Sequence, residues 1–445
     1  MSSTIAAIAT PLGKGAVSII RLSGDKALDI ASKVFSTKKL ANFKDAIPNT
    51  MYFGKFNAEN FYDMCLAVYF KAPHSFTGED TVEFQCHGGI RLTEEVLKVL
   101  LQNGATIASK GEFTKRAFLN GKYSLAEAEG IIDMINSENL ASLNASSRLM
   151  SGYLSEKVNA INKKILDITA SLEASLDYPD ELEEEVKADL FDKLNSLQIS
   201  IKNILRTAKL GRIIKNGINV AIIGEPNIGK SSLLNCILGK DRAIVTDIAG
   251  TTRDTLEERV EINGVFVNFI DTAGIRDTSD IVEKIGVDKA HSSAKNCDIM
   301  IILLPAYRSM NDTERELLDK YKDKDIIKVY NKSDLGVLPH CSDGIVISCQ
   351  NKENIEYLLK VITEKFTKGD IDFSGEVLTN YRHIEALERA LDSMKSATKA
   401  SFDYAPTECI LIDLRICYRA LGEISGETCD EDIIDRIFSK FCLGK

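Results

Sequence analysis

Three short segments of the chain carry the residue types that bind a nucleoside triphosphate. Residues 224–231 read GEPNIGKS and fit the phosphate-binding loop pattern G-x-x-x-x-G-K-[ST]. Residues 271–274 read DTAG and fit the D-x-x-G element that senses a γ-phosphate, and residues 331–334 read NKSD. Each segment follows an apolar run typical of a buried strand. A phosphate-loop pattern alone arises often by chance, but the three in this order and spacing predict a guanine-nucleotide switch domain.

The phosphate end of the predicted site depends on the loop that precedes Lys230. We expect a helix to begin at Lys230, so that backbone N–H groups and the helix N-terminus face the phosphates. Lys230 would neutralise charge on the β- and γ-phosphates, and Ser231 would bind Mg²⁺. Thr252 is expected to supply a second Mg²⁺ ligand, with Thr251 as the alternative. The other residues of these segments expected near the phosphates are Ile228, Gly229, Ser232, Asp271, Thr272, Ala273 and Gly274.

The base end of the predicted site depends on one carboxylate. Asp334 offers paired acceptors to the guanine edge, and Asn331 and Lys332 shape the pocket around it. Adenine would leave this carboxylate unpaired in a dry site, which gives specificity for guanine. Ser348, in the segment SCQ at 348–350, occupies the expected position of a further base-side loop, a weak signal.

One position departs from the pattern of Ras-like GTPases. Ile275 follows Gly274 where a glutamine would orient the attacking water, and an apolar side chain cannot do so. Hydrolysis is therefore very slow, or other residues handle the water and the charge. Asn227 is a candidate ligand for a monovalent cation at the phosphates. Glu283 is a candidate for orienting the water, and the alternative is that it is an exposed helix carboxylate.

Composition limits the classes of function. The chain has 445 residues, with 65 Asp and Glu against 55 Lys and Arg, so we expect contact with a nucleic acid to be local or through a partner. The ten cysteines include no C-x-x-C pair and no Cys/His set at zinc spacing, which favours reduced thiols in a cytoplasm. We identify no signal or transit peptide, and no apolar run approaches the ~20 residues that span a membrane.

Residue patterns divide the chain into three regions. Residues 1 to about 120 mix short β-type runs with glycine turns and two expected helices, which is typical of an α+β domain. Residues 125–212 and those after 375 are helical, whereas residues 217–368 alternate strands and helices as in a doubly wound parallel sheet. We predict an N-terminal domain at 1–120 and a discontinuous all-helical domain at 121–212 and 376–445. A Ras-like P-loop domain at 213–375 is inserted into the helical domain.

Several elements are predicted individually. Strands are expected at 17–20, 65–70 and 82–84 in the first region, and at 218–223, 265–270, 299–304, 326–330 and 345–348 in the nucleotide domain. Thr428 and Glu431 are expected to form a capping box before the last helix. The residues expected to share one helix face are Ile410, Leu414, Cys417 and Leu421.

Further motifs carry a resemblance to one family. They read TIAAIATP at 4–11, SFTGED at 75–80, CHGG at 86–89, GEFTKRAFLNGK at 111–122 and CLGK at 442–445. Together with the nucleotide-binding segments, they make the chain resemble the MnmE (TrmE) family of tRNA-modification GTPases over essentially its full length. The C-[ILV]-G-K terminus is very specific to that family. Lys110, Pro305, Cys349 and Gln350 depart from its usual pattern.

The resemblance implies an enzyme that acts on the wobble uridine of certain tRNAs. With the FAD-dependent partner MnmG (GidA), such a homodimer forms a heterotetramer and adds an aminomethyl or carboxymethylaminomethyl group at C5 of the uridine. The one-carbon unit comes from 5-formyl- or methylene-tetrahydrofolate bound by the N-terminal domain, which also forms the homodimer, and FAD belongs to the partner alone. The resemblance carries the folate contacts onto Arg21, Glu83, Lys122 and Lys445. The absence of a recognisable transit sequence favours a bacterial cytoplasm over an organelle, and we expect no membrane attachment.

The resemblance also implies that GTP hydrolysis depends on K⁺. By motif, the K⁺ ligands are Asn227, Thr246, Ile248 and Thr251, and Glu283 matches the acid that orients water. The two nucleotide domains of a dimer would meet across their switches, where Arg253 and Asp254 lie. The neighbouring residues that would contact the nucleotide are Thr246, Asp247, Ile248, Ala249 and Gly250.

Cys442 has two interpretations. The residue types alone favour core packing on the apolar face of a terminal helix, because no histidine lies nearby in the sequence to act as a base. The family resemblance implies that a near-terminal cysteine is needed for modification and is a candidate catalytic residue.

Two other functions are compatible with parts of the sequence. A GTPase of ribosome assembly would share the nucleotide segments, but it would carry a basic RNA-binding module. A folate-dependent aminomethyltransferase with a regulatory switch would act on a protein or a small amine. Incubation with the flavoprotein partner, a folate donor and tRNA separates the three, because only an MnmE-type enzyme yields a modified wobble uridine.

Overall fold

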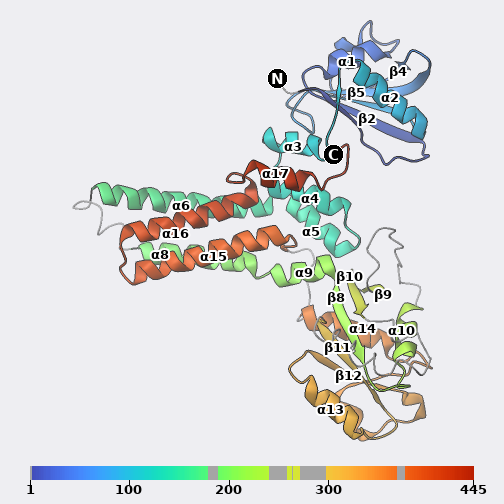
Figure 1. Cartoon of the computed structure of the whole chain (residues 1–445), viewed down its shortest axis with the longest axis vertical. Helices are drawn as coiled ribbons and strands as arrows, with labels where there is room; N and C mark the ends of the chain where they lie inside the picture. Colours follow the sequence, from blue (N-terminus) through green and yellow to red (C-terminus); the bar gives the residue numbers. More distant parts are fainter. Residues whose placement is uncertain (1–2, 179–188, 240–257, 263, 271–296, 368–375) are drawn as a thin grey trace. The chain divides into compact units, whose positions relative to one another are not determined.

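The computed structural model describes residues 3–178, 189–239, 258–262, 264–270, 297–367 and 376–445. Two compact units make up the chain. The first unit contains residues 1–136, 146–202 and 385–445, and the second contains residues 137–145 and 203–384 (Figure 1). Each unit is therefore built from segments that are distant in the sequence.

The first unit contains a seven-stranded sheet with the order β3-β4-β5-β6-β2-β1-β7. All neighbours are antiparallel except β1 and β7, which are parallel. The three strands predicted in this region are confirmed as parts of β2, β5 and β6. The strand bounds are β1 Ile5–Ile8, β2 Val17–Ser23, β3 Phe35–Ser36, β4 Met51–Asn57, β5 Tyr62–Phe70, β6 Thr81–His87 and β7 Thr106–Ile107.

Three α-helices, rather than the two expected, belong to the first 120 residues. Helices α1 (Ala27–Val34) and α2 (Ile90–Gln102) pack on the sheet over an aromatic core that includes Phe35, Phe56 and Phe84. A short 3₁₀ helix, η1 (Phe43–Asp45), adds Phe43 to this core. The additional helix, α3 (Glu112–Leu119), begins after Gly111, whose φ of 69° favours glycine.

The helical part of the first unit is assembled from both sides of the inserted segment. Helices α6 and α16 pack along each other, with an ion pair of 2.7 Å between Glu173 and Arg415. The predicted buried face of α16 is confirmed, since its four residues are at most 4% exposed. The helix bounds are α4 Leu125–Ile135, α5 Leu140–Met150, α6 Tyr153–Asp177, α8 Leu190–Leu205, α15 Tyr381–Phe402, α16 Thr407–Ser425 and α17 Glu431–Phe438. Of these, α5 and α15 begin in the second unit, and α8 ends in it.

The predicted capping box before α17 is wrong. The N-cap of α17 is Asp430, and Thr428 instead donates its hydroxyl to the backbone oxygen of Arg419 at 2.7 Å. A Cβ on Gly422 would lie 2.7 Å from the Thr428 hydroxyl oxygen, so Thr428 packs directly on helix α16. This tertiary contact removes Thr428 from the end of the next helix.

The second unit contains a six-stranded sheet with the order β13-β12-β11-β8-β10-β9. It is parallel except for the edge strand β9, which pairs antiparallel with β10 and was not predicted. The last predicted strand is shorter than expected, since β13 ends at Val346. The bounds are β8 Ile218–Ile223, β9 Glu258–Ile262, β10 Val265–Ile270, β11 Ile299–Pro305, β12 Ile326–Asn331, β13 Ile345–Val346, α9 Ala208–Asn216, α10 Lys230–Leu238, α13 Asp312–Lys320, α14 Ile355–Thr367, η2 Ser333–Leu335 and η3 Pro339–Asp343.

This sheet confirms the predicted α/β fold class and places the candidate residues. The phosphate-loop segment follows the carboxyl end of β8, and the NKSD segment begins with the last residue of β12. The carboxyl ends of parallel strands meet at one edge of a doubly wound sheet, where ligands bind. The two segments therefore lie at the edge where a nucleotide site is expected.

The segment that enters this domain and the segment that leaves it contact each other. The Leu378 backbone N–H donates to the Thr207 hydroxyl oxygen at 3.2 Å, and α9 packs against β10. Gly211 in α9 approaches residue 378 so closely that a Cβ would lie 1.6 Å from the Leu378 backbone oxygen.

We expect Gly211→Ala to destabilise the second unit by about 1–3 kcal/mol, although alanine is the better helix former, because the backbones must separate. Chemical denaturation of the full chain measures this effect. Gly13→Ala is the matched control, because no described atom lies within 4 Å of its added Cβ. Equal stability of the two variants would contradict the role of Gly211.

Candidate functional site

The phosphate loop has the backbone conformation that its glycines and Asn227 allow. Helix α10 begins at Lys230, as predicted, and its N-cap Gly229 has a φ of 106°. Asn227 has a φ of 62°, in the left-handed region that asparagine tolerates better than most residues. A Cβ on Gly229 would lie 2.3 Å from the side-chain nitrogen of Asn331, so only glycine fits at this position.

Lys230 lies inside this loop. Its ammonium group donates to the backbone oxygens of Gly224 and Glu225, both at 2.9 Å. Burial lowers the pKa of Lys230, and the charge of Glu225 partly opposes this effect. The cation is therefore held at the centre of the loop, where an anion bound by the surrounding N–H groups would meet it.

Asn331 joins the phosphate loop to the base-side loop. Its side chain is buried, donates to the Ile228 backbone oxygen at 2.9 Å and accepts from the Cys349 N–H at 3.3 Å. On the same side, the Ser348 hydroxyl donates to Asp334 at 2.7 Å. The structure thus brings together five of the predicted residues, namely Ile228, Gly229, Asn331, Asp334 and Ser348.

A polar network that the sequence analysis missed holds Glu225 of the phosphate loop. Arg308 donates to Glu225 at 3.1 Å and to Glu314 at 3.0 Å, and the Asn311 side chain donates to Glu225 at 2.7 Å. Asn311 and Glu314 also form a capping box at the start of α13. The N-x-x-E pattern at 311–314 could have predicted the start of α13. The hydrogen bond from Asn311 to the phosphate loop is visible only in the three-dimensional structure.

Some of the remaining predicted site residues are described by the structure and others are not. Lys332, Ser231 and Ser232 are described: Lys332 is in the left-handed region at a φ of 63°, and both serines lie in the first turn of α10. The predicted residues outside the described part are Thr246, Asp247, Ile248, Ala249, Gly250, Thr251, Thr252, Arg253, Asp254, Asp271, Thr272, Ala273, Gly274 and Glu283.

A second group of predicted residues lies on the N-terminal sheet. Arg21 and Glu83 are opposite each other on β2 and β6, and their side chains form an ion pair of 2.7 Å that is largely shielded from solvent. The Arg21 guanidinium lies 5.4 Å from the centre of the Phe76 ring and 5.6 Å from that of Phe113. Two aromatic rings and a carboxylate therefore surround this cation.

The C-terminal tail reaches the same group. The Phe113 N–H donates to the Lys445 backbone oxygen at 3.2 Å, and the Gly111 N–H donates to that of Cys442 at 3.4 Å. A Cβ on Gly444 would lie 2.2 Å from the Ile8 backbone oxygen, so the tail packs tightly on strand β1. The Cys442 side chain is exposed, which contradicts the expectation of core packing.

Lys122 lies beside the loop that carries Phe76. Its ammonium group donates to the Pro73 backbone oxygen at 3.1 Å. The Tyr123 ring lies 5.9 Å from that of Phe76. Lys122 is therefore placed next to the loop whose aromatic ring faces Arg21.

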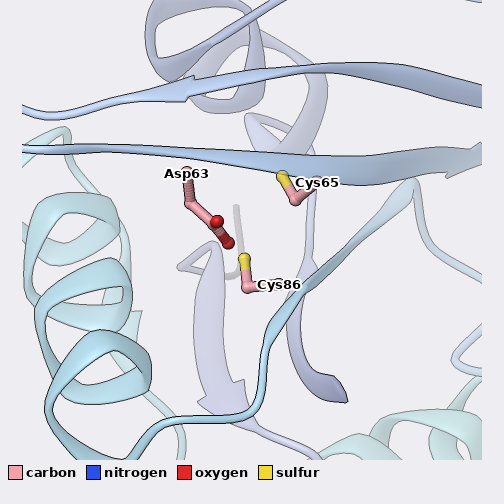
Figure 2. A group of neighbouring side chains, drawn as sticks. All are labelled: Asp63, Cys65 and Cys86. Atoms are coloured by element: carbon pink, nitrogen blue, oxygen red, sulfur yellow. The ribbon is translucent and has the colours of Figure 1, made fainter. Parts of the chain in front are cut away.

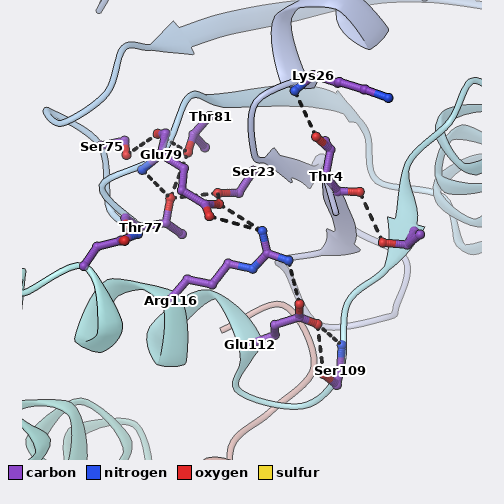
Figure 3. A network of polar contacts seen from close by, with 12 residues as sticks. Thr4, Ser23, Lys26, Ser75, Thr77, Glu79, Thr81, Ser109, Glu112 and Arg116 are labelled. Carbon is purple, nitrogen blue, oxygen red and sulfur yellow. Dashed lines mark hydrogen bonds and ion pairs between the residues drawn. The ribbon is translucent and has the colours of Figure 1, made fainter. Parts of the chain in front are cut away.

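A buried network fixes this loop to helix α3 (Figure 3). Arg116 lies between two carboxylates, donating to Glu79 at 3.1 Å and to Glu112 at 2.8 Å, and the Ser23 hydroxyl donates to Glu79 at 2.8 Å. Burial acts to raise the pKa of Glu112, but hydrogen bonds from Ser109 and Arg116 outweigh it and leave the pKa lowered. The network holds Phe76 and Phe113, which lie on the two segments it joins, in place around Arg21.

Figure 2 shows a compact group of potential metal ligands on β5 and β6. One side-chain donor atom from each of Asp63, Cys65 and Cys86 lies within 4.8 Å of the others. However, both Asp63 oxygens already bond to His87, at 2.6 and 3.0 Å. The hydrogen bond with Cys65 and burial raise the pKa of Cys86, whereas a metal requires thiolates. With three donors, one fewer than structural zinc sites use, we interpret the group as packed core thiols.

Among the described residues, none of the helices combines the length and the apolar character needed to cross a membrane.

Comparison with known proteins gives matches along the whole chain. Residues 4–122 match the family model described as GTP-binding protein TrmE N-terminus, and residues 125–442 match that of the MnmE helical domain. The chain is 41% identical to the tRNA modification GTPase MnmE of Lactococcus lactis subsp. cremoris (strain MG1363), over 99% of this chain and 98% of that protein. It is 40% identical to the protein of the same name from Clostridioides difficile (strain 630), over 100% of both chains.

Among solved structures, Era in complex with MgGDPNP and nucleotides 1506–1542 of 16S ribosomal RNA is 26% identical. The likeness covers 40% of this chain and 67% of that chain, with a TM-score of 0.27.

Proposed function

Because the chain belongs to the MnmE (TrmE) family of tRNA modification GTPases, it is a GTP hydrolase of tRNA modification, and we propose how its residues divide this work. The second unit binds and hydrolyses GTP with K⁺ and Mg²⁺. The first unit binds a tetrahydrofolate derivative. The hydrolysis supports addition of an aminomethyl or carboxymethylaminomethyl group to C5 of the wobble uridine, together with MnmG.

The observation that carries the GTP assignment is the buried Asn331 bridge between the phosphate loop and the base-side loop. It sets the distance between the anion-binding end and Asp334, which is the acceptor for the guanine N1–H and N2–H groups. The Ser348 hydroxyl holds the Asp334 carboxylate at 2.7 Å, so its orientation is fixed before the base arrives. Preorganisation of this kind reduces the entropy lost on binding.

Two described residues at the phosphate end, Ser231 and Asn227, carry side-chain oxygens of the kind that Mg²⁺ and K⁺ accept as ligands. Ser231 places a hydroxyl in the first turn of α10, directly after Lys230 in the sequence, and hydroxyl oxygens suit hard cations. We propose that Ser231 and Thr252 hold Mg²⁺, and that Asn227, Thr246, Ile248 and Thr251 hold K⁺. These cations would neutralise charge that develops during phosphoryl transfer.

Glu283 would then orient the attacking water, because Ile275 cannot. Arg253 and Asp254 would lie where the nucleotide domains of a homodimer meet. The remaining residues proposed to contact the nucleotide are Asp247, Ala249, Gly250, Asp271, Thr272, Ala273 and Gly274.

The group around Arg21 supports the folate proposal. Folate carries a flat pterin with an N–H edge and glutamate carboxylates. Phe76 offers an aromatic face, Glu83 offers a carboxylate for the N–H edge, and Lys122 and Lys445 offer cations for the carboxylates, while the buried Phe113 ring packs beside Arg21. Exposure of Cys442 in the tail that packs beside Phe113 supports a chemical role for its thiol in the modification.

We also propose the domain division and assembly implied by these sites. Residues 1–120 form a folate-binding and dimerisation domain, and residues 121–212 and 376–445 form the helical domain. Residues 213–375 form the inserted GTPase domain, and the contact between Thr207 and Leu378 supports insertion at this point. The homodimer assembles with MnmG into a heterotetramer in a bacterial cytoplasm, and FAD enters only with that partner.

Steady-state GTP turnover in KCl and in NaCl of equal ionic strength tests the hydrolysis proposal. We expect a large potassium-specific rise in kcat, which Glu283→Gln abolishes while GTP still binds. Equal turnover in the two salts would remove the K⁺ site from the account and leave the family assignment in place.

Asp334→Asn tests the base-side assignment. We expect the variant to lose about 100-fold in affinity for GDP, because an amide N–H faces guanine N–H groups and leaves buried donors unpaired. It should gain affinity for XDP, whose carbonyl at position 2 accepts from the amide. Equilibrium binding of both nucleotides to both proteins measures the exchange, and an unchanged preference for GDP would place the base elsewhere.

Glu83→Gln tests the folate assignment, because it keeps the size of the side chain but removes the charge opposite Arg21. We expect tetrahydrofolate binding, measured by calorimetry, to weaken about tenfold or more with the loss of a charge-assisted hydrogen bond. Glu94→Gln, on the exposed side of α2, is the control. With MnmG, the folate donor and tRNA, the variant should form less modified uridine at limiting folate and retain its GTP turnover. Normal folate affinity in Glu83→Gln would contradict the assignment.

A further inference from the structure

Two cysteines lie in contact between the walls of the nucleotide site. Cys236 is on helix α10, which begins with the phosphate-loop lysine, and Cys349 directly follows Ser348 in the base-side loop. The Cys236 thiol donates to the Cys349 backbone oxygen at 3.1 Å. Both side chains are half-buried and pack against the same apolar core. Spacing along the sequence does not reveal this pair, because 113 positions separate the two residues.

The neighbouring Cys236 thiol also affects the pKa of Cys349. Burial raises the pKa of Cys349 to about 12, and the nearby Cys236 thiol adds to the shift, as does the charge of Asp334. Cys349 thus keeps its proton at neutral pH. The thiolate is the reactive form of a cysteine, so the raised pKa makes Cys349 the less suitable of the two to attack an oxidant first, and we assign that step to the partly accessible Cys236.

We propose that Cys236 and Cys349 are a reversible disulfide-forming site, oxidised by hydrogen peroxide or an organic hydroperoxide. The sulfur of Cys236 attacks the peroxide, the O–O bond breaks, and Cys236 becomes a sulfenic acid while water or an alcohol leaves. The sulfur of Cys349 then attacks that of Cys236, the S–O bond breaks, and a second water leaves with the thiol proton. Two thiols and one peroxide give one disulfide, and a dithiol reductant reverses the reaction.

The disulfide would affect the base-side loop, which forms hydrogen bonds with Asn331 and Asp334. The Cys349 N–H donates to Asn331, and the adjacent Ser348 hydroxyl donates to Asp334. A disulfide requires its two Cβ atoms to lie about 3.5–4.5 Å apart, so its formation ties Cys349 to helix α10 and constrains the loop that makes these two hydrogen bonds. We expect oxidation to lower the affinity for guanine nucleotide. This consequence rests on the proposed nucleotide site, whereas formation of the disulfide does not.

A second pair of neighbouring cysteines provides an internal comparison. Cys65 and Cys86 lie within 4.8 Å of each other but are only 3% and 1% exposed. Cys236 and Cys349 are half-buried, so a small oxidant reaches them without unfolding of the domain. Of these two pairs, only the one at the nucleotide site should therefore form a disulfide on mild oxidation.

The test uses the reduced full-length protein and a small molar excess of hydrogen peroxide. Peptide mapping under non-reducing conditions should identify a cross-link between the peptides that contain Cys236 and Cys349, with the loss of two hydrogen atoms. Dithiothreitol should reverse it. Binding of a fluorescent GDP analogue should weaken about tenfold on oxidation, which is the factor expected for one net hydrogen bond, and should recover on reduction.

Cys236→Ala should bind the analogue normally and lose the response to peroxide, because its thiol contacts Cys349 and the core rather than Asn331 or Asp334 in the described part of the chain. Cys409→Ala, which removes an exposed cysteine of the other unit, should respond like the unaltered protein. Absence of the cross-link, or a cross-link from either cysteine to another residue, would overturn the proposal. If the cross-link forms in a protein that binds no GDP when reduced, the disulfide stands and the nucleotide assignment fails.

Discussion

The side-chain amide of Asn331 is the contact on which the nucleotide site depends. It is 2% exposed and reaches the phosphate loop through Ile228 and the base-side loop through Cys349. Gly229 must lack a side chain because this amide occupies the space. The lysine and the serines begin helix α10, whereas Asp334, which we propose to read the base, lies in η2, and the Asn331 bridge links the phosphate loop to the base-side loop. Such a buried polar link is costly to break, because each freed group would remain without a partner.

In the N-terminal part of the chain, a buried arginine instead of a buried amide links two separate segments. Arg116 is 9% exposed and links Glu79 to Glu112, and thereby the loop carrying Phe76 to the helix carrying Phe113. Both rings face Arg21, which pairs with Glu83 across two strands. The C-terminal tail closes on this group through backbone hydrogen bonds to residues 111 and 113. A segment made last along the chain is therefore packed against the first strand.

Sequence patterns predicted most of the architecture, because buried parallel strands appear as continuous apolar runs. Strands β8 and β10 match their predicted bounds, and α10 begins at Lys230 as expected. The edge strand β9 was missed because its burial alternates weakly, although the sequence Asn263-Gly264 between β9 and β10 is typical of a hairpin turn. Thr428 was misread because a tertiary contact with α16 overrides its local capping preference. The Arg308 network and the Cys236–Cys349 contact join residues 83 to 113 positions apart, which spacing cannot reveal.

Equilibrium binding of GDP to Asn331→Ala tests the central role of the bridge most directly. Loss of two net hydrogen bonds, about 2 kcal/mol, predicts an affinity roughly thirtyfold weaker than that of the unaltered protein. Asn103→Ala serves as the control, because it removes one side-chain hydrogen bond at the end of α2 in the other unit. An Asn331→Ala protein with the same unfolding transition and the same GDP affinity as the control would contradict the account.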